Sequence, residues 1–482
     1  MDIYKFTYPR EKYDELNLSK QDILHLIMKH QQLVPRMRKN LKYYEGKHKI
    51  LEGEKKDGPD TRLVCNHAKD ISDTASSYFI GNPVTYNSEK DIKPLLDSFE
   101  DAGVDEVDGD NGLDLSIHGL AYEYIYTKEG EPVPTIKSLS PLNTFMVHDD
   151  TIEENELFAV YYYARNDDTD HKPTAYMATV CTQNYKYVMT ILNRDEPQAV
   201  NEEPEPHFYG EVPIVEYQNN KLAIGDFELQ IPLIDAYNTI MSDRVNDKEQ
   251  FIDAILAVYG TLLGDDEEDE DGATETDRAM DALKKKKLVQ MPDGSKMEYV
   301  TRTFDESGIE ILRRAIEQDI HKFSHIPCMT DESFAGNVSG VAMEFKLLGM
   351  ENITKIKTRY YKKGLRKRIR LFANFLKTRS INVDTTGISP VFTRAMPKNL
   401  LEISQITANL WGKVSKKTLL SQIPFVTDVD GEVEAVEKEA EEAVKQQQAM
   451  FGLGSNEPLP DDGRDTGSRR PSGLKEDNTA LQ

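Results

Sequence analysis

Apolar residues recur every three to four positions in several long stretches of the chain. This spacing places them on one face of a helix and predicts amphipathic helices. The first stretch has Ser19 as an N-cap and is interrupted at Pro35, which lacks a backbone donor. The predicted helices span residues 19–44, 69–80, 231–263, 305–324, 341–379 and 399–447.

Between residues 115 and 190 the pattern changes to runs of β-branched and aromatic residues separated by turn residues. Such runs are typical of strands. The predicted strands span residues 122–126, 144–147, 158–163 and 185–192, with extended structure also at 84–86 and 383–394. Between two long helices, a small helix at 279–287 and a hairpin of 288–291 with 297–300 are predicted. The order of these predicted helices and strands along the chain indicates a mixed α+β fold.

A loop at residues 326–340 leads directly into the most basic helix. Gly336, Asn337 and Gly340 break helix and tolerate positive φ, which predicts an exposed loop. The helix after it would be about 58 Å long at 1.5 Å per residue. The pattern leaves open whether this helix is continuous or broken near Gly364.

The length of 482 residues favours two to four domains with ample chain for a core. Cys65, Cys181 and Cys328 lie far apart and form no CxxC pair, so we expect reduced thiols in a cytoplasmic compartment. An apolar signal core and a run of about eighteen apolar residues are both missing. These observations argue against secretion and against a membrane span.

The formal net charge is -25, which argues against generic gripping of duplex DNA, because such surfaces gather Lys and Arg against phosphates. Charge is also segregated along the chain. Residues 341–380 are strongly basic, 265–271 are an unbroken acidic run, and 432–442 are rich in Glu. Such segregation is typical of a defined partner face or intersubunit pairing, and also of solvated helix surfaces.

Motifs of the common enzyme classes are missing, including a phosphate-binding loop, HExxH, GxSxG and GxGxxG. The acidic run resembles half of an EF-hand loop, but Arg278 stands where the bidentate carboxylate is required. His321 and His325 are four residues apart with no third metal ligand nearby. We therefore predict a protein that is not an enzyme, with no catalytic residue, metal or cofactor.

Seven segments, in order, resemble portal proteins of long-tailed phages that infect Gram-positive bacteria. The resemblance spans about residues 40–380. The segments are YYEGKH at 43–48, DTASSYFIGNPVTY at 73–86, SIHGLAYEY at 116–124, PLNTFMVHDDTIE at 141–153, GEVPIVEYQNN at 210–220, GDFELQIPLIDAYNTIMSDRVND at 225–247 and GNVSGVAMEFKLL at 336–348.

The resemblance implies an α+β portal architecture. It assigns residues 1–230 to a β-rich wing, 231–263 and 304–325 to stem helices, 264–303 to a small α/β clip, 326–340 to a tunnel loop, 341–398 to a long wing helix with a return strand, and 399–453 to crown helices. Residues 454–482 are polar and predicted to be a disordered tail.

The same resemblance implies a ring of about twelve subunits at one capsid vertex, through which DNA is packaged and ejected. The implied location is the virion, after assembly in the host cytoplasm, without membrane contact. The implied partners are double-stranded DNA, the terminase large subunit, a head-completion or adaptor protein, and the major capsid and scaffolding proteins. An internal scaffold or adaptor of the phage head, and a packaging ATPase or nuclease subunit, are the alternatives.

Three groups of candidate site residues follow from the loop, the clip and the basic helix. Phe334 either faces the channel or pins the loop to its own helix. The tunnel-loop residues expected at the DNA are Asp331, Glu332, Ser333, Phe334, Asn337 and Ser339. The expected clip contacts to DNA or a partner, alternatively a solvated helix end, are Lys284, Lys285, Lys286 and Lys287. The basic-helix residues expected to pair with acidic groups of adjacent subunits are Lys362, Lys363, Arg366 and Lys367.

Overall fold

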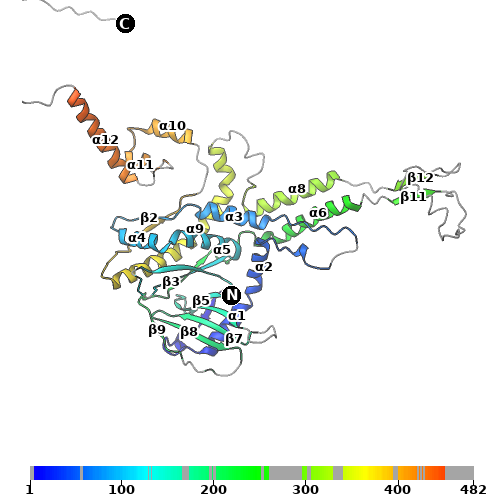
Figure 1. Cartoon of the computed structure of the whole chain (residues 1–482), viewed down its shortest axis with the longest axis horizontal. Helices are drawn as coiled ribbons and strands as arrows, with labels where there is room; N and C mark the ends of the chain where they lie inside the picture. The colour runs from blue at the N-terminus through cyan, green and yellow to red at the C-terminus, as the bar shows by residue number, and fades with distance from the viewer. Residues whose placement is uncertain are drawn as a thin grey trace, which may run out of the picture. The chain divides into compact units, whose positions relative to one another are not determined.

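The structure is a computed structural model that separates into two compact units, Met1–Met396 and Pro397–Gln482 (Figure 1). It describes residues 5–54, 58–128, 130–131, 133–165, 173–194, 198, 202–250, 255–259, 296–300, 306–328, 340–394, 400–420, 423, 426 and 429–450. Over these ranges, no helix is both long enough and apolar enough to cross a membrane.

The first unit combines helices with four sheets. Its helices are α1 (Lys20–Gln31), α2 (Val34–Tyr44), α3 (His67–Ile80), α4 (Lys93–Ala102), α5 (Val104–His118), α6 (Ile231–Gln250), α8 (Glu306–Ser324) and α9 (Gly340–Thr378), with short 3-10 turns at Arg10–Lys12, Lys49–Leu51 and Glu228–Gln230. Its strands are β1 (Phe6–Tyr8), β2 (Thr85–Asn87), β3 (Leu120–Tyr126), β4 (Thr135–Leu139), β5 (Thr144–Asp149), β6 (Glu156–Arg165), β7 (Ala175–Cys181), β8 (Tyr185–Leu192), β9 (Glu205–Pro206), β10 (Ile214–Gln218), β11 (Ile255–Tyr259), β12 (Lys296–Val300) and β13 (Ser389–Val391).

The largest sheet has the order β1-β5-β6-β7-β8-β9, and a smaller sheet has the order β10-β3-β4. Four apolar residues of α1, which include Ile23 and Ile27, pack against the large sheet at Phe145 and Phe158. The small sheet packs against α5 and α9, with Tyr217 of β10 in that core. The predicted mixed α+β class is confirmed.

The predicted helix at 19–44 is confirmed as two helices that meet before Pro35. Ser19 caps α1, because its Oγ accepts a hydrogen bond from the backbone N of Asp22 at 3.2 Å. Pro35 lies in the first turn of α2. Backbone N–H groups there have no carbonyl partner within the helix, so the missing N–H of proline costs no helical hydrogen bond.

The predicted helix at 231–263 is confirmed for residues 231–250, which form α6, and is wrong at residues 255–259. Residues 255–259 instead form β11, which pairs antiparallel with β12. An apolar run of this length fits a strand as well as a helix, and the cross-strand partner decides between them. The predicted strand at 297–300 is confirmed within β12, whereas its proposed partner at 288–291 and the small helix at 279–287 lie outside the described residues.

The basic helix is one continuous helix of 39 residues, so Gly364 does not break it. A Cβ at Gly364 would lie 2.3 Å from the Tyr217 ring, which shows that the glycine is needed for close packing. The Tyr217 ring in turn stacks on Tyr361 of the same helix, with the centroids 4.3 Å apart.

A ladder of polar residues on α6 holds an extended segment of the chain. Asn238, Ser242 and Asn246 are four residues apart, a rise of about 6 Å per step along a helix. Alternate residues of an extended chain are about 6.6 Å apart, so the two repeats match. The backbone N–H groups of Cys65, Leu63 and Thr61 donate to these three side chains at 2.8, 2.9 and 2.7 Å, respectively.

The second unit is helical, as predicted, but in separate pieces. Gly412, at φ 78, lies between the first two helices. The helices are α10 (Leu400–Leu410), α11 (Lys416–Leu420) and α12 (Val429–Met450). In the first unit, a strand is predicted at 383–394, but only Ser389–Val391 form one, β13, which pairs with β2. The tail at 454–482 lies outside the described residues.

Candidate functional site

Of the three predicted groups of site residues, only the basic-helix group falls in the described part of the chain. The tunnel-loop residues lie within 329–339 and the four clip lysines within 260–295, both outside the described residues. Lys362, Lys363, Arg366 and Lys367 all lie on α9.

The buried lysines of α9 are neutralised within their own chain. Lys357 Nζ donates to Asp226 Oδ2 at 2.7 Å. Lys367 is paired with Glu156 and also donates to the carbonyl oxygen of Ile214 at 2.7 Å. Lys367, which the sequence assigns to intersubunit pairing, therefore has its partners inside the subunit.

Arg368 is the centre of a fully buried ionic cluster between α9, α5 and β3. Its Nε donates to Glu123 Oε1 at 2.9 Å and its Nη2 donates to Asp108 Oδ1 at 2.6 Å. Tyr361 and Tyr217 donate their hydroxyl groups to Asp108 and Glu123, respectively. Side chains from α9, α5, β3 and β10 therefore share one cluster with no water contact at the arginine, whose exposed fraction is 0%.

The two carboxylates determine the charge state of this cluster. Burial disfavours the charged guanidinium, but Asp108 and Glu123 outweigh burial and hold the pKa of Arg368 well above its usual value. Burial, together with the charge of Asp108, raises the pKa of Tyr361 well above its usual value. The tyrosines therefore stay protonated and act as donors. The cluster fixes α9 against the core.

The exposed cations of α9 behave differently from the buried ones. In the part of the chain that the structure describes, Arg359, Lys363 and Arg366 are exposed and form no ion pair. Arg370 is half exposed and binds Glu211 through two hydrogen bonds of 2.6 and 2.8 Å. Lys362 lies over the Phe392 ring at 5.8 Å. The helix therefore has a paired buried side and an exposed cationic side.

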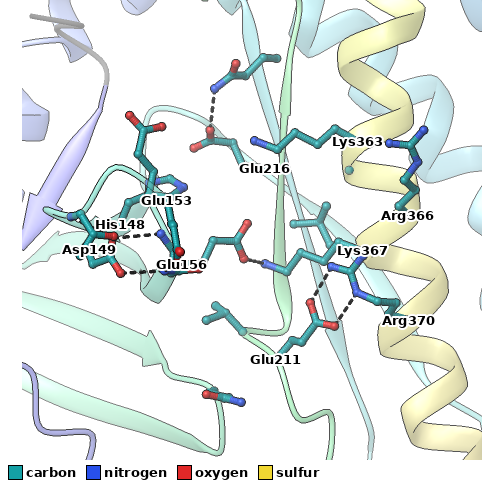
Figure 2. A pocket seen from close by; sticks show the side chains of 18 of the residues that line it. His148, Asp149, Glu153, Glu156, Glu211, Glu216, Lys363, Arg366, Lys367 and Arg370 are labelled. Carbon is teal, nitrogen blue, oxygen red and sulfur yellow. Dashed lines mark hydrogen bonds and ion pairs between the residues drawn. The ribbon is translucent and has the colours of Figure 1, made fainter. Parts of the chain in front are cut away.

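A groove of about 1100 Å³ runs beside the exposed cations (Figure 2). Its opposite wall comes from β10 and from the turn between β5 and β6. In Figure 2, Lys363 extends from α9 toward Glu216, and Lys367 reaches Glu156. Glu216 accepts hydrogen bonds from Tyr122 and Gln218, both at 2.9 Å.

Two carboxylates of the acidic wall, Asp149 and Glu154, are stabilised in their ionised form by hydrogen bonds. Hydrogen bonds from Thr151 and then Asn155 lower the pKa of Asp149 and close the turn. A hydrogen bond from Lys5, at 2.7 to 2.9 Å, lowers the pKa of Glu154. The groove therefore presents fixed charges of both signs, which suits a charged protein surface.

The chemistry expected of an enzyme site does not assemble around this groove. Within the described ranges, no group of three or more His, Cys, Asp or Glu side chains is placed to hold a metal ion. His321 lies in the last turn of α8, and its Nδ1 lies 3.0 Å from the carbonyl oxygen of Ile326. His325 lies beyond the helix end at φ 60, so the two histidines do not share a helix face.

Sequence reasoning does not identify the acidic partners of the helix. Glu123 is the acidic residue that the sequence could have pointed to, because a carboxylate inside the apolar strand LAYEYIY requires a buried partner. Asp108 is one of several acids in α5, and nothing in its neighbours distinguishes it. Both are far from Arg368 in sequence.

Residues 23–446 match the family described as phage portal protein, SPP1 Gp6-like. A portal protein of Bacillus phage SPP1 is 24% identical over 438 residues, which cover 86% of this chain and 84% of that protein. A portal protein of Clostridium phage phiCD119 is 26% identical over 229 residues, covering 46% of this chain and 48% of that protein. A solved structure, the neck of an empty GTA particle computed with C6 symmetry, covers 74% of this chain and 89% of its own, with a TM-score of 0.43 and 10% identity.

Proposed function

The chain belongs to the SPP1 Gp6-like family of phage portal proteins, and we propose from this that it forms a ring of about twelve subunits at one capsid vertex. The ring would be the channel for genome packaging and ejection. The observation that carries the proposal is a family match that runs from residue 23 to residue 446.

The stem of this ring would be built from α6 and α8. In support, the two helices are joined by ion pairs, with Arg244 Nη1 2.9 Å from Glu310 and Lys248 Nζ 2.9 Å from Glu306. Arg313 adds a hydrogen bond of 2.8 Å to the Tyr237 hydroxyl group. The chain leaves α6 into β11 and returns from β12 into α8, which is the connectivity that a clip at the end of a stem needs.

We assign the remaining parts on the same basis. The sheets and helices before residue 230 would form the wing together with α9, and residues 326–340 the tunnel loop. The second unit would form the crown. The six tunnel-loop residues and the four clip lysines given above stay predictions, because they lie outside the described residues.

A channel of this kind does not need to grip DNA. With a net charge of -25 per chain, the ring would confine a polyanion by shape and repulsion, which keeps the barriers to sliding small. The partners would be the DNA, the terminase large subunit, a head-completion or adaptor protein, and the capsid and scaffolding proteins. The mature location would be the virion.

The family is non-enzymatic, which agrees with the prediction made from the sequence motifs. The packaging ATPase or nuclease and the internal scaffold were the alternatives to a portal protein. A family match over most of the chain favours the portal protein over both of them.

Negative-stain electron microscopy of the purified protein, with its mass measured in solution on the same sample, tests the proposal. Rings with a central hole and a mass near twelve subunits are the expected result. A protein that stays monomeric from micromolar to high micromolar concentration, at both low and physiological salt, would contradict it.

A further inference from the structure

The exposed side of α9 is a single continuous face. Its exposed residues recur at spacings of three and four, which align along one side of a helix. The first half of the face is apolar, with Phe345 73%, Leu348 49% and Ile356 44% exposed. The second half carries the unpaired cations Arg359, Lys363 and Arg366 and the half-exposed Arg370. We call residues 345–370 on this side the α9 face.

An apolar and cationic face of this length on a buried core helix is unusual for a protein that stays alone. Large exposed apolar side chains in a row mark surfaces that bind another protein. The cations beside them form no ion pair in the described part of their own chain, unlike Lys357, Lys367 and Arg368 on the buried side. Lys363 faces the acidic wall of the groove, where its charge lowers the pKa of Glu154, but it makes no direct ion pair there. Both observations indicate a partner with an acidic surface.

This chain itself carries such a surface, on α4 and α5. Residues 96–110 contain no Lys or Arg. The exposed carboxylates there are Asp97, Glu100, Asp101, Asp105, Glu106 and Asp110, and none of them forms an ion pair in the described structure. Burial, then repulsion from Asp108 and Glu106, outweighs the attraction of Arg368 and raises the pKa of Asp105.

The acidic surface and the α9 face lie on opposite sides of α9. Phe99 of α4 packs against Phe372 of α9 with ring centroids 4.9 Å apart. Phe372 is nine residues from Lys363, which places it across the helix axis from that lysine, and six residues from Arg366, which places it about 120° around the axis from that arginine. Because α4 packs there with its buried side, which includes Phe99, its exposed carboxylates lie on the side of α4 that faces away from α9.

We propose that the α9 face of one copy binds the acidic surface of α4 and α5 of the next copy. Two different surfaces on opposite sides of a subunit make a head-to-tail contact, which is the kind that closes a ring. The inference rests on the proposed ring and names the surfaces that build it. It also explains how chains of net charge -25 associate, since complementary charge is concentrated where they meet.

Two complementary charge reversals test the contact. Variant A carries Arg359→Glu, Lys363→Glu and Arg366→Glu, and variant B carries Asp97→Lys, Glu100→Lys and Asp101→Lys. Each variant alone juxtaposes like charges, so each should need at least about tenfold more protein than wild type to form rings. An equal mixture should form alternating rings, because each altered surface then meets its complement.

A matched control separates the contact from net charge. Lys39→Glu, Lys42→Glu and Lys47→Glu change the charge as variant A does, on exposed positions of α2 and its end. This variant should assemble as wild type does. Equal loss in the control, or a mixture of folded A and B that stays unassembled, would overturn the inference.

Cross-linking of the wild-type protein keeps the test independent of variant folding. A carbodiimide should join Lys363 to Glu100 or Asp101, and only between chains, as shown by mixing isotopically light and heavy protein. Wild-type rings without such links would overturn this inference and leave the ring itself intact. A wild-type protein that forms no ring would overturn both.

Discussion

The buried cluster at Arg368 gives the sharpest test of how the fold is held together. Arg368→Met removes the cation and leaves Glu123 and Asp108 buried at 0% and 2% exposure. Breaking a buried ion pair from one side costs about 3 to 5 kcal/mol, because the remaining charge has neither water nor a counter-ion. Since two carboxylates share Arg368, we expect the upper half of that range.

Arg370→Met is the matched control on the same helix. Arg370 makes a bidentate pair with Glu211, but its side chain is 48% exposed, so water screens the interaction. Its removal should cost less than about 1 kcal/mol. The assay is urea denaturation of both variants and wild type at one protein concentration and oligomeric state. Equal losses for Arg368→Met and Arg370→Met would refute the reasoning.

Two further measurements identify charge as the cause. Adding Asp108→Asn and Glu123→Gln to Arg368→Met removes the unpaired charges and should restore most of the lost stability. In Arg368→Met alone, the folded-state pKa of the carboxylates should exceed the unfolded value. The loss should then be largest at neutral pH and should shrink as the pH falls. A triple variant as unstable as the single one would mean that packing, not charge, is responsible.

Three other predictions follow from single contacts. Gly364→Ala should cost about 1 to 3 kcal/mol in urea denaturation, because the new Cβ meets the Tyr217 ring at 2.3 Å, whereas alanine elsewhere in a helix is neutral or stabilising. Asn238→Ala should cost about 1 to 3 kcal/mol, because it leaves the buried partners of its amide group unsatisfied, and faster hydrogen exchange at residues 61–65 should report the released segment. Burial lowers the pKa of His30 to about 4, so the stability that depends on neutral His30 should be fully present above pH 6.5 and should be lost as the pH drops from 6.5 toward 4, by at most about 3 kcal/mol. A melting temperature that stays constant across this pH window would contradict this prediction. So would a His30→Gln variant whose stability depends on pH as strongly as that of wild type.

The paired and unpaired cations of α9 lie on different sides of this helix and should respond differently to substitution. Neutralising Lys367 alters contacts inside the subunit, since it binds Glu156 and Ile214. Lys363 and Arg366 have no such internal partner in the described structure. Assembly experiments on this helix should therefore treat the two sides separately, because only the exposed side reports on contacts between copies.

Local sequence signals determined much of the secondary structure. Ser19 and Pro35 set the starts of α1 and α2, the β8 strand matches the predicted 185–192, and α8 begins one residue after its predicted start. These signals depend on neighbours within one or two turns of chain, so a sequence contains them in full. The family resemblance was likewise present in the sequence, since it rests on consecutive residues.

Tertiary structure alone decided the outcomes that depend on distant partners. The sequence left open whether the helix breaks near Gly364, and only the Tyr217 ring against it shows why a glycine stands inside a continuous helix. Residues 255–259 became a strand because β12, some forty residues later, supplies the pairing. The basic helix contained many similar cations, and the sequence did not distinguish Arg368 from Arg366. Burial next to Asp108, 260 residues away, makes the first a core ion and leaves the second at the surface. The reason is physical: the energy of a charge is set by its solvent and its partners, and both are chosen by packing rather than by neighbours in sequence.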